Sequence, residues 1–132
     1  METLLLILMP ILIQIESSGD PNAIGDNGEA VGSLQIHRIY VREVNRILGE
    51  NRFTYADRND TQKSVEMAKI HIGYWSPKNM EGTFLEKLVI LGRIHNGGPN
   101  GEKKDKTLGY GEKIKKLYKQ AYKSGFKSPR ID

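Results

Sequence analysis

The first stretch of the chain is strongly apolar. Every residue from Leu4 to Ile13 is hydrophobic apart from Pro10, and a run this short cannot span a bilayer. No basic residue precedes it and no small-residue cleavage site follows, so it lacks the form of a signal peptide. We therefore expect a buried helix over residues 3–17, bent or restarted at Pro10, and no export signal within the chain.

Four further helices are expected where apolar residues recur at helical spacing. Thr83 and Glu86 have the spacing of a capping box, and the run Asn96–Pro99 cannot continue a helix. The expected ranges are 33–48, 60–75, 83–95 and 107–124. Residues 19–29 are rich in Gly, Pro, Asn and Asp, which is typical of tight turns and a short hairpin. The pattern predicts a single, mainly helical domain over residues 1–132.

Charge is unevenly distributed along the chain, whose net charge is +4. Residues 101–132 carry ten Lys or Arg against four acids, whereas residues 1–36 carry five acids and no Lys or Arg. A basic last helix would attract polyanions such as nucleic acid, anionic lipid or an anionic cell wall, although a solvated helix face explains the charge equally well. The chain has no cysteine, which excludes disulfides, thiolate metal sites and a cysteine nucleophile.

Carboxylates near the end of the first helix are the leading candidates for chemistry. Glu16 follows a long apolar run, and partial desolvation beside Ile13 and Ile15 would favour its neutral, proton-donating form. Asp26 and Glu29 lie in the turn-rich stretch that follows, and glycosidases use two carboxyl groups that flank the bond they cleave. A glutamate exposed at a helix end and an aspartate that merely makes a turn are the alternatives.

A second cluster of candidates lies after the fourth helix. The run His95–Pro99 places a side-chain amide beside two glycines, where it could bind a sugar hydroxyl or N-acetyl group, or simply end a helix. Tyr110 and Trp75 could stack on sugar rings or belong to the core. His37, His71 and His95 have no metal-ligand spacing, so no metal and no cofactor is expected.

Three ordered segments resemble motifs of lysozyme-like proteins. The run Ile15–Gly19 is similar to the E-S-x-G signature of goose-type lysozymes and soluble lytic transglycosylases. The run Gly25–Ile36 resembles the G-D-x-G…G-x-x-Q-[IV] stretch of goose-type lysozymes, and Gln35–Tyr40 resembles the Q-I-K-x-x-Y run of invertebrate-type (destabilase-like) lysozymes. Residues 93–110 look like the R-x-H-N-G-G-P-x-G…T-x-x-Y pattern of the invertebrate type. The resemblance covers about residues 12–118.

This resemblance implies a lysozyme-like α+β fold, in which helices surround a substrate cleft beside a small hairpin. It implies that Glu16 is the general acid and that Asp26 assists as nucleophile, electrostatic stabiliser or water-orienting base, with Glu29 as the alternative second carboxylate. The residues that match cleft-lining positions, or lie close to them in sequence, are Ser33, Gln35, Tyr40, His95, Asn96 and Tyr110. The chain departs from the invertebrate type in having no cysteine, a shorter spacing from Glu16 to Gln35, and Gly111 in place of an aromatic residue.

The expected activity is that of a muramidase, a bacteriolytic hydrolase of the β-1,4 bond between N-acetylmuramic acid and N-acetylglucosamine in peptidoglycan. A lytic transglycosylase that forms 1,6-anhydro products is the alternative within the class, and a non-catalytic module that binds polyanions or nucleic acid is the alternative outside it. The expected partners are glycan strands and, through the basic last helix, an anionic wall surface, with no nucleic acid and no membrane insertion. We expect a monomer of bacterial or phage origin that is secreted, periplasmic or phage-associated.

Overall fold

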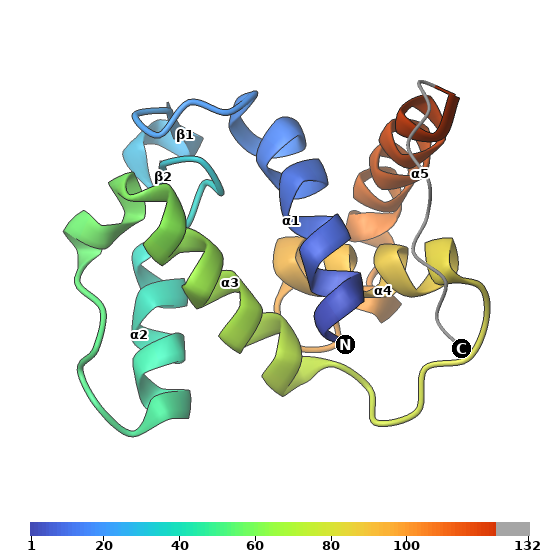
Figure 1. Ribbon diagram of the computed structural model, residues 1–132. Coiled ribbons are helices and arrows are strands. Elements are labelled where there is room, and N and C mark those ends of the chain that lie inside the picture. Colours follow the sequence, from blue (N-terminus) through green and yellow to red (C-terminus); the bar gives the residue numbers. More distant parts are fainter. Residues whose placement is uncertain (124–132) are drawn as a thin grey trace. The chain divides into compact units, whose positions relative to one another are not determined.

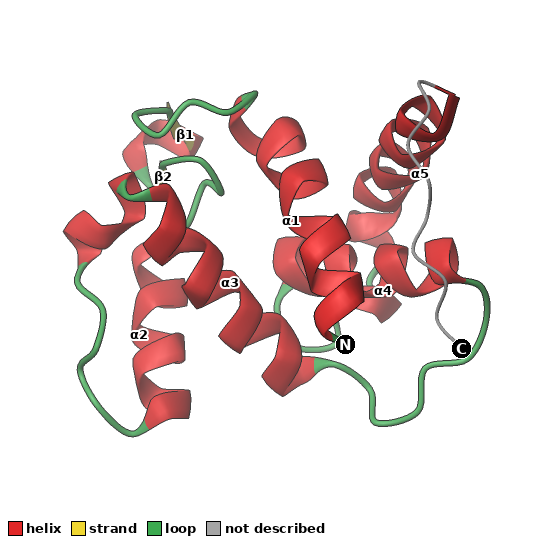
Figure 2. Ribbon diagram, in the orientation of Figure 1, coloured by secondary structure: helices red, strands yellow, loops and turns green. Residues whose placement is uncertain are grey.

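The computed structural model describes residues 1–123 as a mainly helical fold with a two-stranded antiparallel hairpin (Figures 1 and 2). Within that range there are five α-helices. The chain divides into two compact units, one formed by Leu12–Trp75 and the other by Met1–Ile11 with the described residues from Ser76 onward. The first boundary falls inside the first helix, α1 (Glu2–Ser17).

The unit formed by Leu12–Trp75 contains the hairpin and a packed pair of helices. Strands β1 (Ile24–Gly25) and β2 (Ala30–Val31) pair antiparallel, with Ile24 opposite Val31. Helix α2 (Arg38–Leu48) packs against α3 (Thr61–Trp75), and a 3-10 turn at Tyr55–Asn59 precedes α3. The buried apolar side chains of this unit are Leu12, Ala30, Leu34, Ile36, Val41, Val44, Phe53, Met67, Ala68 and Ile72.

The other unit is built around α4 (Phe84–Gly97) and α5 (Leu108–Lys123), which pack against each other. Two short 3-10 turns, Gly101–Lys103 and Asp105–Thr107, connect them and lie against α4. The buried apolar side chains here are Leu4, Leu5, Leu8, Met9, Leu88, Leu91, Ile94, Tyr110 and Ile114.

Most of the expected helices are confirmed, and two of their bounds need correction. Helix α1 continues through Pro10 as one helix, so of the two expected alternatives it does not restart there. Helix α4 ends at Gly97, two residues later than expected. The second helix begins at Arg38 rather than near Ser33, because residues just before it have a non-helical backbone. Gln35 has a φ of 50°, which no right-handed helix tolerates, and Ile36 pairs with Val31 in an antiparallel bridge. The expected end of the last helix at residue 124 lies outside the described residues.

The start of α4 follows its sequence pattern. The Thr83 hydroxyl accepts from the Glu86 backbone N–H at 3.1 Å, and a Glu86 carboxylate oxygen accepts from the Thr83 N–H at 3.1 Å. These reciprocal bonds make the expected capping box, and they hold the pKa of Glu86 below its ordinary value. In the part of the chain that is described, no helix combines the length and the apolar character needed to cross a membrane.

Candidate functional site

Glu16 lies one residue before the end of α1, at the place where this helix is tied to the hairpin segment. The Ser17 hydroxyl donates to the Ser33 carbonyl at 2.8 Å and accepts from the Gly19 N–H at 3.1 Å. These bonds link the helix end to the backbone that follows β2. Glu16 itself is half-buried, so its carboxyl group is neither fully solvated nor sealed inside the core.

Tyr40 lies close enough to Glu16 for the two groups to interact electrostatically. Burial raises the pKa of the Tyr40 phenol well above its ordinary value, and the negative charge of Glu16 raises this pKa further. The Tyr40 ring packs on the ring of His71 from α3, with centroids 4.2 Å apart. Tyr40 therefore stays a neutral hydrogen-bonding group beside the candidate acid, braced by an aromatic neighbour.

The Gln35 side chain stabilises the hairpin segment through hydrogen bonds to its backbone. Its side-chain amide donates to the carbonyls of Ala23 and Gly32, both at 3.1 Å. Gly25 leaves the room for this arrangement, because a Cβ at that position would collide with the Gln35 Oε1 atom. In the motif that runs from Gly25 to Gln35, the first glycine and the glutamine are thus explained by one packing contact.

Ser33 has a structural connection as well. It is almost fully buried, and its hydroxyl is 2.6 Å from the Thr61 hydroxyl at the first residue of α3. Its carbonyl is the acceptor for Ser17. Ser33 therefore joins the end of α1 to the start of α3.

Asp26 lies in the turn between β1 and β2, exposed and paired with a histidine. The His37 Nε2 atom is 3.0 Å from the Asp26 Oδ2 atom, with 41% of the His37 side chain and 71% of the Asp26 side chain exposed. So exposed a pair adds little stability but orients the Asp26 carboxylate. Glu29, the alternative second carboxylate, is also exposed, and its backbone carbonyl accepts from the Arg58 guanidinium at 3.4 Å.

Backbone strain is concentrated in this part of the chain. The described residues other than glycine that have positive φ values are Ser18, Asp26, Asn27, Gln35 and Asn100. All but Asn100 lie between residues 18 and 35. Such conformations cost about 1–3 kcal/mol each and are typical of binding and catalytic sites.

The candidates His95, Asn96 and Tyr110 belong to the other compact unit. His95 and Tyr110 are buried, at 7% and 8% exposure, whereas Asn96 is exposed at the end of α4. The structure therefore brings Glu16, Ser33, Gln35 and Tyr40 together around one hairpin, with Asp26 in its turn, and places the remaining three in the α4–α5 unit.

A hydrogen-bond network explains much of the motif around His95. The Arg93 guanidinium donates to the Thr107 hydroxyl at 2.7 Å and to the Lys104 carbonyl at 2.8 Å. The buried Thr107 hydroxyl is 2.6 Å from the Gly101 carbonyl, and the Lys104 ammonium donates to the Gly97 carbonyl at 2.6 Å. We call these four contacts the Arg93–Thr107 network. It satisfies carbonyls of the loop that ends α4.

Sequence reasoning did not identify His37, Thr61 or His71 as members of the site. His37 directly follows the Gln35-Ile36 pair of the motif, which could have marked it, but its contact with Asp26 spans eleven residues. His71 and Thr61 come from α3 and carry no local signal. In the part of the chain from residue 1 to 123, no group of three or more His, Asp and Glu side chains is placed to hold a metal ion.

Comparisons of the chain with protein-family models, with curated proteins and with solved structures found no significant match.

Proposed function

We propose that this chain is a muramidase with a lysozyme-like fold, which hydrolyses the β-1,4 bond after N-acetylmuramic acid in peptidoglycan. Glu16 is the general acid that protonates the departing sugar oxygen. The observation that carries the proposal is the electrostatic contact between Glu16 and Tyr40, at the point where α1 is tied to a strained hairpin.

The surroundings of Glu16 suit a proton donor. The carboxyl group is half-buried, so its charge is less well solvated than that of a surface glutamate. The neighbouring phenol of Tyr40 keeps its proton and can donate a hydrogen bond to a sugar or to the carboxylate left after proton transfer. The bonds from Ser17 restrict the helix end that carries the acid, which favours the fixed geometry that acid catalysis requires.

Asp26 is the second carboxylate of the proposal. It is exposed in the hairpin turn, and His37 orients it from the start of α2. In this role Asp26 activates a water molecule or stabilises the positive charge that develops on the sugar ring. Glu29 is three residues away and exposed, but among residues 1–123 no side chain forms a salt bridge with its carboxylate, as His37 does with that of Asp26.

A lytic transglycosylase is the second candidate, favoured by one observation. The Asp26 carboxylate is already engaged by His37 and is largely solvated, whereas a transglycosylase needs only the acid Glu16. In that reaction the C6 hydroxyl of muramic acid replaces water as the nucleophile, and the product is an anhydro sugar.

Mass spectrometry of the fragments released from purified peptidoglycan tests the proposal directly. We expect wild-type protein to release fragments with reducing muramic acid ends, which are one water heavier than anhydro ends. Glu16→Gln should release none while keeping the wild-type circular dichroism spectrum and Tm. Anhydro ends would establish the transglycosylase, and full release by Glu16→Gln would refute the role of Glu16 in either reaction.

A further inference from the structure

The first half of α2 carries positive charge that its surroundings do not neutralise. Arg38 is the first residue of α2, and Arg42 lies one turn later on the same face, both exposed. Among residues 1–123, no carboxylate lies within salt-bridge distance of either guanidinium, and α2 has no acid in its first turn. Because a helix N-terminus is itself partially positive, two cations there are electrostatically unfavourable.

The same charges gather around Tyr55, which is 38% exposed. The guanidinium carbons of Arg38 and Arg58 lie 5.1 and 5.6 Å from the centre of its ring, and Arg42 donates to its hydroxyl at 3.1 Å. Arg58 is buried and held by the carbonyls of Tyr55 and Ile36. Burial lowers the pKa of Arg58, and repulsion from Arg38 lowers it further. The fold thus holds three cations around one phenol.

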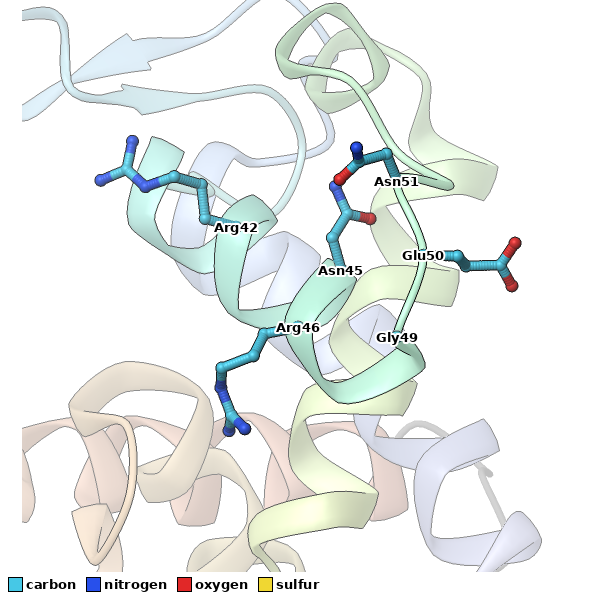
Figure 3. Close-up of a pocket in the computed structure, with 6 residues that line it drawn as sticks. All are labelled: Arg42, Asn45, Arg46, Gly49, Glu50 and Asn51. Atoms are coloured by element: carbon cyan, nitrogen blue, oxygen red, sulfur yellow. The ribbon is translucent and has the colours of Figure 1, made fainter.

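Arg46, one turn further along α2, differs from Arg38 and Arg42 because its charge is neutralised by a carboxylate. Its guanidinium makes two hydrogen bonds to the Glu43 carboxylate, at 2.6 and 2.9 Å. Figure 3 shows Arg42 and Arg46 extending from α2 away from the Glu50 side chain, at the pocket that Arg42 shares with the turn after the helix. The unpaired charge is therefore confined to the first half of α2, around Arg38 and Arg42.

We propose that Arg38, Arg42 and Tyr55, which we call the arginine site, bind the phosphodiester groups of an anionic cell-wall polymer. This inference rests on the proposed muramidase function, because that activity would bring the chain to such a wall. A guanidinium presents a planar fork of donors that matches two phosphate oxygens. Two forks on successive helical turns lie about 6 Å apart along the helix axis, which suits repeated charges on an extended polymer.

Nucleic acid is the competing polyanion, and the geometry of Tyr55 argues against it. Proteins bind single-stranded nucleic acid by combining a basic groove with open aromatic faces on which bases stack. The Tyr55 ring already has two guanidinium groups packed near it, so its faces are partly occupied. What the site leaves available is hydrogen-bond donors on Arg38 and Arg42, which can bind phosphate groups without a base stacked on Tyr55.

Cosedimentation with purified Gram-positive walls tests the proposal. The proteins carry Glu16→Gln so that the walls are not digested, and they are compared on intact walls and on walls stripped of phosphodiester polymer by hydrofluoric acid. We expect the added pair Arg38→Gln and Arg42→Gln to weaken binding to intact walls by about tenfold. On stripped walls the variant and its parent should bind alike.

The matched control carries Lys63→Gln and Lys69→Gln. Both lysines are exposed on α3, in the same unit as the arginine site. This control removes the same charge and should weaken binding to intact walls less than about twofold. The pair Arg38→Lys and Arg42→Lys keeps the charge but not the fork, so an intermediate loss of about threefold is expected. Thermal unfolding shows whether each variant is folded.

Three results would overturn the proposal. An equal loss in the α3 control would show that only net charge matters. A loss that persists on stripped walls would show that phosphodiester groups are not the ligand. A tenfold loss of binding to a single-stranded oligonucleotide, with wall binding unchanged, would assign the site to nucleic acid. A separate experiment tests the muramidase function: the protein with Glu16 intact is incubated with stripped walls. If no fragments are released, the muramidase proposal fails, whatever the binding results are.

Discussion

Residues 16–37 and residues 93–107 both resemble lysozyme motifs in sequence, and their local structures differ. In residues 16–37 the carboxylates of Asp26 and Glu29 are exposed, Glu16 is half-buried, and positive φ values recur. In residues 93–107 the Arg93–Thr107 network binds the side chains of Arg93, Lys104 and Thr107 to one another and to backbone carbonyls, and Thr107 is fully buried. The resemblance thus falls on solvent-accessible carboxylates in one segment and on a hydrogen-bonded framework in the other.

This difference separates the consequences of mutation. Changes at carboxylates of the first segment should alter activity with little effect on stability, because Asp26 and Glu29 are exposed and Glu16 is only half-buried. Changes in the second segment should alter stability first, because buried donors and acceptors that lose their partners are costly. Measuring both quantities for each variant therefore tests the comparison.

The largest effect is expected for Glu16→Gln. Loss of the general acid should lower the rate of peptidoglycan cleavage by about 10²–10⁴-fold, while the free energy of unfolding stays close to that of the wild type. Glu2→Gln, at an exposed glutamate at the start of the same helix, is the control and should be fully active. If Glu16→Gln instead lowers the free energy of unfolding and the folded fraction stays active, Glu16 has a structural role, like the residues of the second segment.

Asp26→Asn should lower hydrolysis by about 100-fold if Asp26 is the second carboxylate. Glu29→Gln should leave the rate within about twofold, since Glu29 is only the alternative. Initial rates on purified peptidoglycan compare the two variants directly. If Glu29→Gln is the slower variant, Glu29 is the second carboxylate. If both variants keep their activity and the products are anhydro sugars, the transglycosylase is favoured.

Gly101→Ala should destabilise the protein without changing the chemistry of the folded fraction. A Cβ at this buried position would meet the Arg93 carbonyl and the Ile94 backbone, at a cost of about 1–3 kcal/mol. Chemical denaturation measures the change, and activity is normalised to the folded fraction. Gly109→Ala on α5 is the control, because nothing lies within 4 Å of the added Cβ.

Thr107→Val would test the network without adding bulk. It should lower stability by a similar amount, about 1–3 kcal/mol, because it removes the buried hydroxyl that accepts from the Arg93 Nε atom and bonds to the Gly101 carbonyl. Loss of catalysis in fully folded Gly101→Ala or Thr107→Val protein would contradict the division between the two segments.

The smallest effect is expected on α5, whose lysines belong to the compact unit that does not contain Glu16. Replacing Lys113, Lys115, Lys116 and Lys119 by Gln should slow lysis of whole walls by about two- to fivefold at low salt, since exposed charges are screened as salt rises. Cleavage of short neutral oligosaccharides should not change. An equal loss on both substrates would mean that α5 contributes to the reaction itself.

Local sequence information predicted the helices well because their determinants are local. Helical spacing of apolar residues, the capping box of Thr83 and Glu86 and the run Asn96–Pro99, within which α4 ends, all act within a few residues. The start of α2 was placed too early, near Ser33. Residues 33–37 also have helical spacing, but the bridge from Val31 to Ile36 and the bonds of Ser33 overrode it.

The amino-acid sequence by itself determined a mainly helical chain, a turn-rich segment after Glu16 and the carboxylates that could serve a glycosidase. Only the tertiary structure decided which of these residues meet: Tyr40 beside Glu16, His37 on Asp26, Gln35 packed into the space above Gly25, and Arg38 and Arg42 around Tyr55. The physical reason is that side chains distant in sequence come together only when buried surfaces pack. No local pattern records those distances.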